Sequence, residues 1–243
     1  MAHNVGRRAL VGKRVVAAAL EVLALRADVR ALVIRGAGKH FQAGADLAWL
    51  ARMAGEPPAG AYAAAMATTR TMQMLNEFPR PTLAVVHGAC FGGGCGLVCS
   101  VDVALASEAA LFGVTEVRVG VVPSPISVQL VQAIGFRHAR RYALSGERFD
   151  AAEAMRIGLV HEVLPEGRLG ARVAEVLEAI LLSAPGAVVA AKRSLIAANG
   201  LGIDAAKAAG LAEESARQRS SAEAMEGLAA FREKRRPGWH PAG

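Results

Sequence analysis

Long hydrophobic runs are missing from this sequence of 243 residues. No apolar run approaches the roughly 20 residues that a membrane-spanning helix needs. The opening residues 1–10 have no apolar signal core behind their basic residues. We therefore expect a protein that does not associate with membranes and that resides in the cytoplasm.

Cysteine is also scarce, with only Cys90, Cys95 and Cys99 present. They are odd in number and lie in an apolar, Gly-rich stretch without His or carboxylate neighbours at metal-ligand spacing. We interpret them as small buried thiols. The sequence predicts no metal site.

Acidic residues are fewer than basic ones, which gives a formal net charge of +7. Such a charge is the only feature that would favour a nucleic-acid-binding protein, and the basic residues are scattered along the chain. The densest cluster, residues 232–236, reads as a solvated helix end. We expect no nucleic-acid partner, although a basic surface would suit a small ligand that carries phosphate.

Apolar residues make up 53% of the chain against 20% charged residues, as in a folded enzyme. Short apolar runs at 31–35, 82–87 and 101–106 predict buried strands of an α/β fold. Helical patterns separate and follow these strands, and they dominate beyond residue 128. The predicted helices are 13–26, 59–77, 95–100, 128–134, 137–144, 151–156, 168–183, 185–198 and 204–233.

Three consecutive glycines, Gly92, Gly93 and Gly94, follow a predicted strand and open a predicted helix. Backbone N–H groups at a helix N-terminus lack partners within the helix, so this turn can hold an anion or a developing oxyanion. The phosphate-binding loop GxxxxGK[ST] does not occur. A tight turn with close helix packing remains the alternative interpretation.

A second Gly-rich element, residues 41–47 (FQAGADL), follows the first predicted strand. Gly44 allows a turn that leaves the N–H of Ala45 pointing away from the chain. Asp46 lies in the first turn of a short helical stretch, where a carboxylate is ordinarily a helix cap rather than a catalytic group.

The two Gly-rich elements, followed by residues 112–116 (FGVTE) and 120–123 (GVVP), resemble the enoyl-CoA hydratase/isomerase, or crotonase, family. The resemblance extends from about Ala9 to the C-terminus. It includes the segments 29–39, 144–149, 151–154, 158–161 and 231–235.

The resemblance implies an α/β fold with a crotonase-like spiral of ββα units and a C-terminal helical region that forms trimers. We expect a core over residues 1–183 and a helical region over 184–243. The implied substrate is an acyl-CoA thioester, with no separate cofactor because coenzyme A is part of the substrate. The implied assembly is a homotrimer or a dimer of trimers.

By the same resemblance, the backbone N–H groups of Ala45 and Gly93 form an oxyanion hole. The implied substrate-binding residues are Ala43, Gly44, Asp46, Leu47, Gly92 and Gly94. Water addition to a 2-enoyl-CoA, or proton transfer at its α-carbon, places negative charge on the thioester oxygen. Two preorganised donors would stabilise that charge.

Water-adding members of the family carry two glutamates, and this chain has the second as Glu116 but Gly96 in place of the first. Glu116 is the predicted catalytic residue, with a surface or salt-bridging role as the alternative. A lone glutamate is compatible with a hydratase, a Δ3-Δ2-enoyl-CoA isomerase or a non-catalytic acyl-CoA-binding homologue. Residues 91–97 and 115–120 look most like hydratases of the branched glutaconyl-CoA type, so we favour a hydratase.

Family members usually begin with a β-hairpin ahead of the first helix, whereas this chain reaches its helix almost at once. We expect the hairpin to be missing, which would leave a sheet edge open or covered by another subunit. A misassigned start is the alternative.

Overall fold

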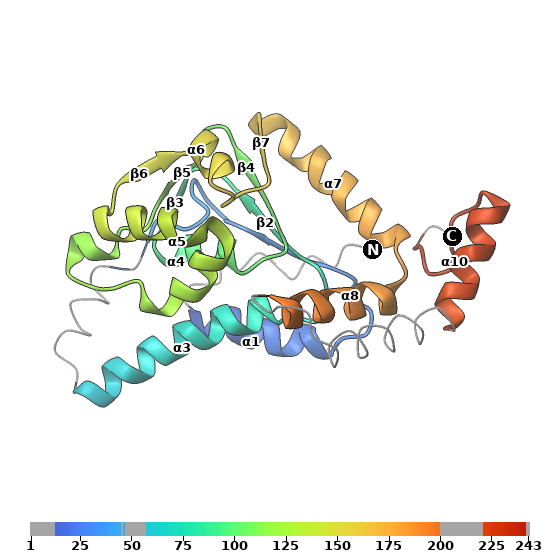
Figure 1. Ribbon diagram of the computed structural model, residues 1–243, viewed down its shortest axis with the longest axis horizontal. Coiled ribbons are helices and arrows are strands. Elements are labelled where there is room, and N and C mark those ends of the chain that lie inside the picture. Colours follow the sequence, from blue (N-terminus) through green and yellow to red (C-terminus); the bar gives the residue numbers. More distant parts are fainter. Residues whose placement is uncertain (1–12, 45, 47–56, 200–220, 242–243) are drawn as a thin grey trace.

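A computed structural model describes residues 13–44, 46, 57–199 and 221–241 (Figure 1). Four predictions fall wholly or partly outside the described residues: the missing N-terminal hairpin, the roles of Ala45 and Leu47, and residues 204–220 of the helix predicted over 204–233. Within the described part, the expected α/β class is confirmed.

The main sheet is parallel and four-stranded, in the order β1-β2-β4-β7. Its strands are β1 (Leu32–Arg35), β2 (Thr82–Val86), β4 (Val103–Ser107) and β7 (Glu162–Leu164). Every residue of β2 is buried, as expected for a parallel strand covered on both faces. The register pairs Ala84 with Ile34 on one side and with Ala104 on the other.

A smaller sheet continues directly from the first. It contains β3 (Ala89–Phe91), β5 (Leu111–Gly113) and β6 (Arg148–Asp150), with β3 parallel and β6 antiparallel to β5. Only two residues separate β2 from β3, so the chain passes from one sheet to the other without a crossover helix. The ends of both sheets therefore lie close together.

Helices cover the main sheet on both faces (Figure 1). On one side, α1 (Lys13–Leu25) and α3 (Pro58–Asn76) pack through a cluster of Leu20, Leu75 and Phe78. On another, α7 (Glu166–Leu182) places Leu169 and Val173 against Val85 and Leu105 of the sheet. Neighbouring strand residues point to opposite faces, so Ala84 and Val86 join the largest core cluster instead.

The largest core cluster lies around α4 (Gly93–Cys99), α5 (Ser127–Ser145) and α6 (Ala151–Arg156). Two 3-10 turns, η1 (Glu116–Val119) and η2 (Ser124–Ile126), link β5 to α5. The predicted helices over 128–134 and 137–144 are confirmed as the two parts of α5, which meet at a kink with non-helical backbone at Gly135. The glycine accounts for the break in the sequence pattern.

The C-terminal part consists of α8 (Pro185–Ala198) and α10 (Ala222–Glu233), with α10 at one end of the molecule in Figure 1. Lys192 of α8 forms an ion pair of 2.7 Å with Asp102 beside β4. The carboxylate of Glu223 in α10 accepts hydrogen bonds from the N–H groups of Gly186 and Ala187 in the first turn of α8. The two hydrogen bonds to Glu223 place α10 against the turn between α7 and α8.

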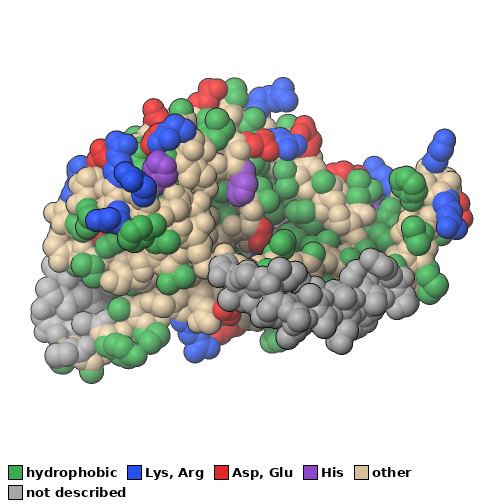
Figure 2. Space-filling model, in the orientation of Figure 1, with side chains coloured by type: hydrophobic (Ala, Val, Ile, Leu, Met, Phe, Trp, Pro, Cys, Tyr) green, Lys and Arg blue, Asp and Glu red, His purple; other side chains and the backbone are tan. Residues whose placement is uncertain are grey.

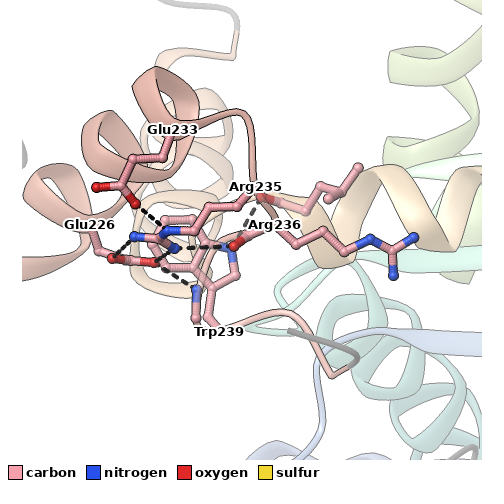
Figure 3. A network of polar contacts seen from close by, with 7 residues as sticks. Glu226, Glu233, Arg235, Arg236 and Trp239 are labelled. Atoms are coloured by element: carbon pink, nitrogen blue, oxygen red, sulfur yellow. Dashed lines mark hydrogen bonds and ion pairs between the residues drawn. The ribbon is translucent and has the colours of Figure 1, made fainter.

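The turn after α10 is held by one guanidinium. Arg235 lies between the carboxylates of Glu226 and Glu233 (Figure 3), at 2.7 Å and 2.5 Å respectively. Gly238 donates its N–H to Glu226 at 2.7 Å. Beside this turn, the indole of Trp239 donates to the carbonyl of Leu182 at the end of α7.

Charged side chains of both signs are interspersed along the upper edge of the face drawn in Figure 2. In the described part of the chain, no group of three or more His, Cys, Asp or Glu residues could hold a metal ion. None of the described helices is by itself long and apolar enough to cross a membrane. By length and composition, α7 and α8 would pass only as a pair, which is bent by 103°.

Candidate active site

Backbone hydrogen bonds bring the two Gly-rich elements side by side. The N–H groups of Phe41 and Gln42 donate to the carbonyls of His87 and Ala89 at 2.9 and 3.0 Å. In return, Phe91 donates to the carbonyl of Gln42 at 2.8 Å. Residues 41–44 therefore run alongside β3, and the segment that precedes Ala45 lies next to the turn that contains Gly93.

The glycine turn joins β3 to α4. Gly92 precedes the helix and Gly93 is its first residue, so the N–H of Gly93 has no acceptor within the helix. The N–H of Gly92 is held by the carbonyl of Gly113 at 2.8 Å, which anchors the turn on β5. This geometry presents the Gly93 donor at the end of the small sheet.

Glu116 lies beside this turn because β5 pairs with β3 and η1 begins three residues after β5. Its Oε1 lies 3.0 Å from the point that a Cβ on Gly92 would occupy. The residue is half-buried, and its Oε2 is shielded from solvent. The Glu116 carboxylate therefore lies against the glycine turn, and its catalytic role stays a prediction.

The site of the expected first glutamate is filled by an apolar side chain. A Cβ on Gly96 would lie 2.3 Å from Cγ2 of Ile126 and 3.3 Å from Cε of Met72. Ile126 is 2% exposed and belongs to the largest core cluster. No side chain fits at residue 96 unless Ile126 moves.

A sequence model of the enoyl-CoA hydratase/isomerase family matches residues 14–242. The chain belongs to this family. It is 36% identical over 220 residues to a putative enoyl-CoA hydratase of Thermus thermophilus, which covers 90% of this chain and 86% of the relative. The structure likewise resembles the crystal structure of an enoyl-CoA hydratase from Shewanella pealeana. The TM-score is 0.88 at 37% identity, over 93% of this chain and 85% of the other.

The relatives also include an isomerase. The chain is 31% identical to the peroxisomal Delta(3,5)-Delta(2,4)-dienoyl-CoA isomerase of Arabidopsis thaliana over 189 residues, 73% of this chain and 68% of the relative. The protein is therefore an acyl-CoA enzyme with a crotonase fold, and its family contains both water-adding and double-bond-shifting members.

The structure describes most of the substrate-binding residues that the resemblance implies in this enoyl-CoA hydratase/isomerase. Gly44 is half-buried beside Phe91 of β3, whereas Ala43 and the side chain of Asp46 are exposed. Gly92 and Gly94 flank Gly93 in the turn. These positions keep the two Gly-rich elements at one end of β3, and their role in substrate binding stays a prediction.

The three cysteines are free thiols, of which Cys90 and Cys95 are buried and Cys99 is half-buried. The Cys95 thiol donates to the carbonyl of Cys90 at 3.2 Å. Burial raises the pKa of the Cys90 and Cys99 thiols well above the usual range. Cys90 and Cys99 are therefore neutral thiols rather than nucleophiles. The interpretation from sequence as buried thiols is confirmed for Cys90 and Cys95, whereas Cys99 is half-buried.

Two residues of this family member escaped the sequence analysis. Gln42 contacts both Gly-rich elements, and Ile126 fills the space next to Gly96. The sequence feature that could have identified Gln42 is a long polar side chain next to a run of small residues. Ile126 gave no signal, because its contact with Gly96 depends on how η2 packs on α4.

Proposed function

We propose that this enzyme adds water across the double bond of a 2-enoyl-CoA and that Glu116 is the carboxylate that transfers the protons. The observation that carries this proposal is the position of the Glu116 carboxylate against Gly92, one residue before the Gly93 donor. A thioester whose oxygen accepts from Gly93 would place its α- and β-carbons within reach of a neighbouring carboxylate.

The proposed oxyanion hole consists of the N–H groups of Ala45 and Gly93. Charge develops on the thioester oxygen as water attacks the β-carbon, so donors fixed before the reaction stabilise the transition state. Loss of one such donor typically costs about 2.7–4 kcal/mol in activation free energy. The backbone bonds between residues 41–42 and β3 support this proposal, since they hold both elements in place.

One carboxylate can complete the proton transfers of hydration. As water adds to the β-carbon, Glu116 takes a proton from the water. Glu116 then gives that proton to the α-carbon of the enolate, which regenerates the carboxylate. Ile126 supports this scheme, because it leaves no room for a second acid at residue 96. The reaction requires no cofactor, since coenzyme A is part of the substrate.

A branched or glutaconyl-type acyl group is the proposed substrate class. Residues 91–97 and 115–120 look like the corresponding segments of hydratases of that type. A carboxylate on the substrate, or an ordered water, would assist Glu116 where other hydratases use a second glutamate.

Isomerisation of a 3-enoyl-CoA is the second candidate. A single carboxylate suits it, because the reaction only moves one proton between two carbons of the same acyl chain. A non-catalytic acyl-CoA-binding protein is the third candidate, and it is motivated by Gly96.

An absorbance assay at the enoyl-thioester band separates these candidates. The substrates are crotonyl-CoA, 3-methylcrotonyl-CoA, 3-methylglutaconyl-CoA and a 3-enoyl-CoA. We expect the band to disappear with the conjugated substrates, fastest with the branched or glutaconyl compounds. Appearance of the band from the 3-enoyl-CoA alone would identify an isomerase. Binding of every compound without any change would identify a non-catalytic protein.

The role of Glu116 is tested by Glu116→Gln, which keeps the shape of the side chain but cannot accept a proton. We expect turnover to fall about 10²- to 10⁴-fold, as for lost acid-base catalysis. Substrate affinity should change little. Glu108→Gln is the matched control, because Glu108 is exposed beyond β4, and it should retain full activity. A fully active Glu116→Gln variant would show that Glu116 does not transfer the protons.

We also propose that the chain assembles as a homotrimer or a dimer of trimers. Met225, Leu228 and Phe231 of α10 are 63%, 56% and 85% exposed. They recur along one side of the helix, so a second copy of the chain could cover them.

A further inference from the structure

The side chain of Gln42 hydrogen-bonds twice to Gly44, the residue directly before the first proposed oxyanion donor. Its Oε1 accepts from the N–H of Gly44 at 2.8 Å, and its Nε2 donates to the carbonyl of Gly44 at 3.1 Å. An amide is suited to this, since it carries one acceptor and one donor on a rigid plane. The opposite orientation of the amide would place donor against donor and acceptor against acceptor.

The bond to the Gly44 carbonyl has a consequence for the next N–H. In a trans peptide group, the C=O and the following N–H lie in one plane and point in opposite directions. The carbonyl of Gly44 shares its peptide group with the N–H that is proposed to be the first oxyanion donor. A side chain that holds this carbonyl therefore fixes the Gly44 side of the peptide group to which the proposed donor belongs.

The same glutamine packs on the second oxyanion element. A Cβ on Gly94 would lie 3.0 Å from both Cβ and Oε1 of Gln42, so these atoms rest against the glycine turn. The backbone of Gln42 is bonded to Ala89 and Phe91 of β3, directly before that turn. Gln42 is half-buried, and it contacts both segments whose N–H groups are proposed to form the oxyanion hole.

We propose that Gln42 is a positioning residue that sets the two backbone donors of the oxyanion hole relative to each other. This role rests on the proposed oxyanion hole and deepens it. Gln42 acts through Gly44 and Gly94, and it transfers no proton itself. Its loss leaves the donors in the chain but lets their directions vary, and small misplacements of this kind reduce rates about 10²-fold.

The experiment compares Gln42→Glu and Gln42→Leu with the wild-type protein, using whichever enoyl-CoA the wild type turns over. Both variants are close to glutamine in size. Ionised glutamate offers only acceptors and so repels the Gly44 carbonyl, whereas leucine offers neither bond. We expect kcat to fall about 10- to 100-fold in both, with KM within a few-fold of wild type. Gln132→Leu, at an exposed position of α5, is the control and should behave as wild type.

The pH profile of Gln42→Glu separates positioning from simple structural support. A protonated glutamate has one O–H donor and one carbonyl acceptor, as the amide does. The ratio of variant to wild-type kcat should therefore rise as the pH falls toward the carboxyl pKa of about 4.3. Gln42→Leu should show a constant ratio. A constant ratio in both variants would overturn the amide-specific role.

A probe that needs no turnover distinguishes this proposal from the proposed hydration. We would bind 4-dimethylaminocinnamoyl-CoA, whose absorption moves to longer wavelength when its thioester oxygen accepts hydrogen bonds. The wild type should show this shift, and Gln42→Leu should bind the probe with a reduced shift. A wild type that shifts the probe but hydrates nothing would refute the hydratase and keep the role of Gln42. An unchanged shift in Gln42→Leu, or no shift in the wild type, would overturn that role.

Discussion

At the scale of single residues, the packing around α4 explains why residue 96 is not the glutamate that water-adding members of the family carry. Residue 96 has no side chain, and Ile126 occupies the space that a Cβ would need. Ile126 is buried in the main core, so its position follows from the packing of η2 and α5 on α4. The glycine and the isoleucine are thus sterically coupled.

This coupling predicts the effect of Gly96→Ala. The added methyl group would overlap Ile126, and overpacking of a well-packed core typically costs about 1–3 kcal/mol in the free energy of unfolding. Ile126→Ala in the same chain should remove part of that penalty, so the two changes should be non-additive in urea denaturation. Gly170→Ala in α7 is the control, because nothing lies within 4 Å of its Cβ. The control should raise stability by up to about 1 kcal/mol. Additive effects of the two substitutions would contradict the coupling.

At the scale of elements, α5 owes its bend to one residue. Gly135 has φ 72° and ψ 158°, a backbone conformation that is essentially confined to glycine. No atom lies within 4 Å of a Cβ at this position, so the backbone conformation and not crowding would oppose a substitution.

We therefore expect Gly135→Ala to reduce the free energy of unfolding by roughly 1–3 kcal/mol, the usual cost of holding a non-glycine residue in such a conformation. Chemical denaturation would measure the loss. Gly167→Ala is a control at a similarly open position in α7, and it should not destabilise the chain. An unchanged stability in Gly135→Ala would mean that α5 straightens without cost.

A polar contact joins α5 to α6. The carboxylate of Glu153 accepts from Arg156 and from the hydroxyl of Tyr142 at 2.5 Å, and these bonds lower the pKa of Glu153 from 4.5 to about 2. Burial, together with the carboxylate of Glu153, raises the pKa of Tyr142 to about 12. The folded state therefore favours the ionised carboxylate.

The sign of the pH effect follows from the lowered pKa. The stabilisation is present above the unfolded pKa of about 4.5 and is lost as the pH falls toward 2. Glu153→Gln should remove this contribution, so the variant should lose less stability between these pH values than the wild type. Thermal unfolding measured across that range would show it. Parallel curves for the two proteins would contradict the assignment, and Glu108→Gln should follow the wild type.

The sequence predicted the longer elements well. A helix of several turns gives a periodic pattern of apolar residues, and a strand of five buried residues gives a continuous apolar run. Four strands were missed, β3, β5, β6 and β7, since three residues are too few for a pattern and their pairing depends on partners far along the chain. The same reason applies to the site. The glycine turn and Glu116 could be predicted as motifs, whereas the contact between Gly96 and Ile126 arises only from tertiary packing.

At the scale of the whole molecule, α10 lies at one end and reaches the rest through the turn between α7 and α8 (Figure 1). Its exposed apolar residues are what the proposed trimer would bury. Phe231→Glu places a charge at the most exposed of Met225, Leu228 and Phe231. We expect this variant to have the mass of one 25.2 kDa chain in light scattering, while the wild type has about three or six times that mass.

Leu195→Glu on α8 is a control for that experiment, because Leu195 is also exposed but lies on another helix. It should assemble as the wild type does. A monomeric wild type, or a Phe231→Glu variant that remains oligomeric, would contradict the role of the α10 surface.

The burial of Cys90 and Cys95 beside the glycine turn also has a practical use. A thiol-modifying reagent cannot reach either sulfur while β3 and α4 remain packed. The rate at which these two sulfurs are labelled at low denaturant would therefore measure how often this part of the protein opens. The two thiols thus report on local opening of the proposed active site, and substrate binding there should slow their labelling.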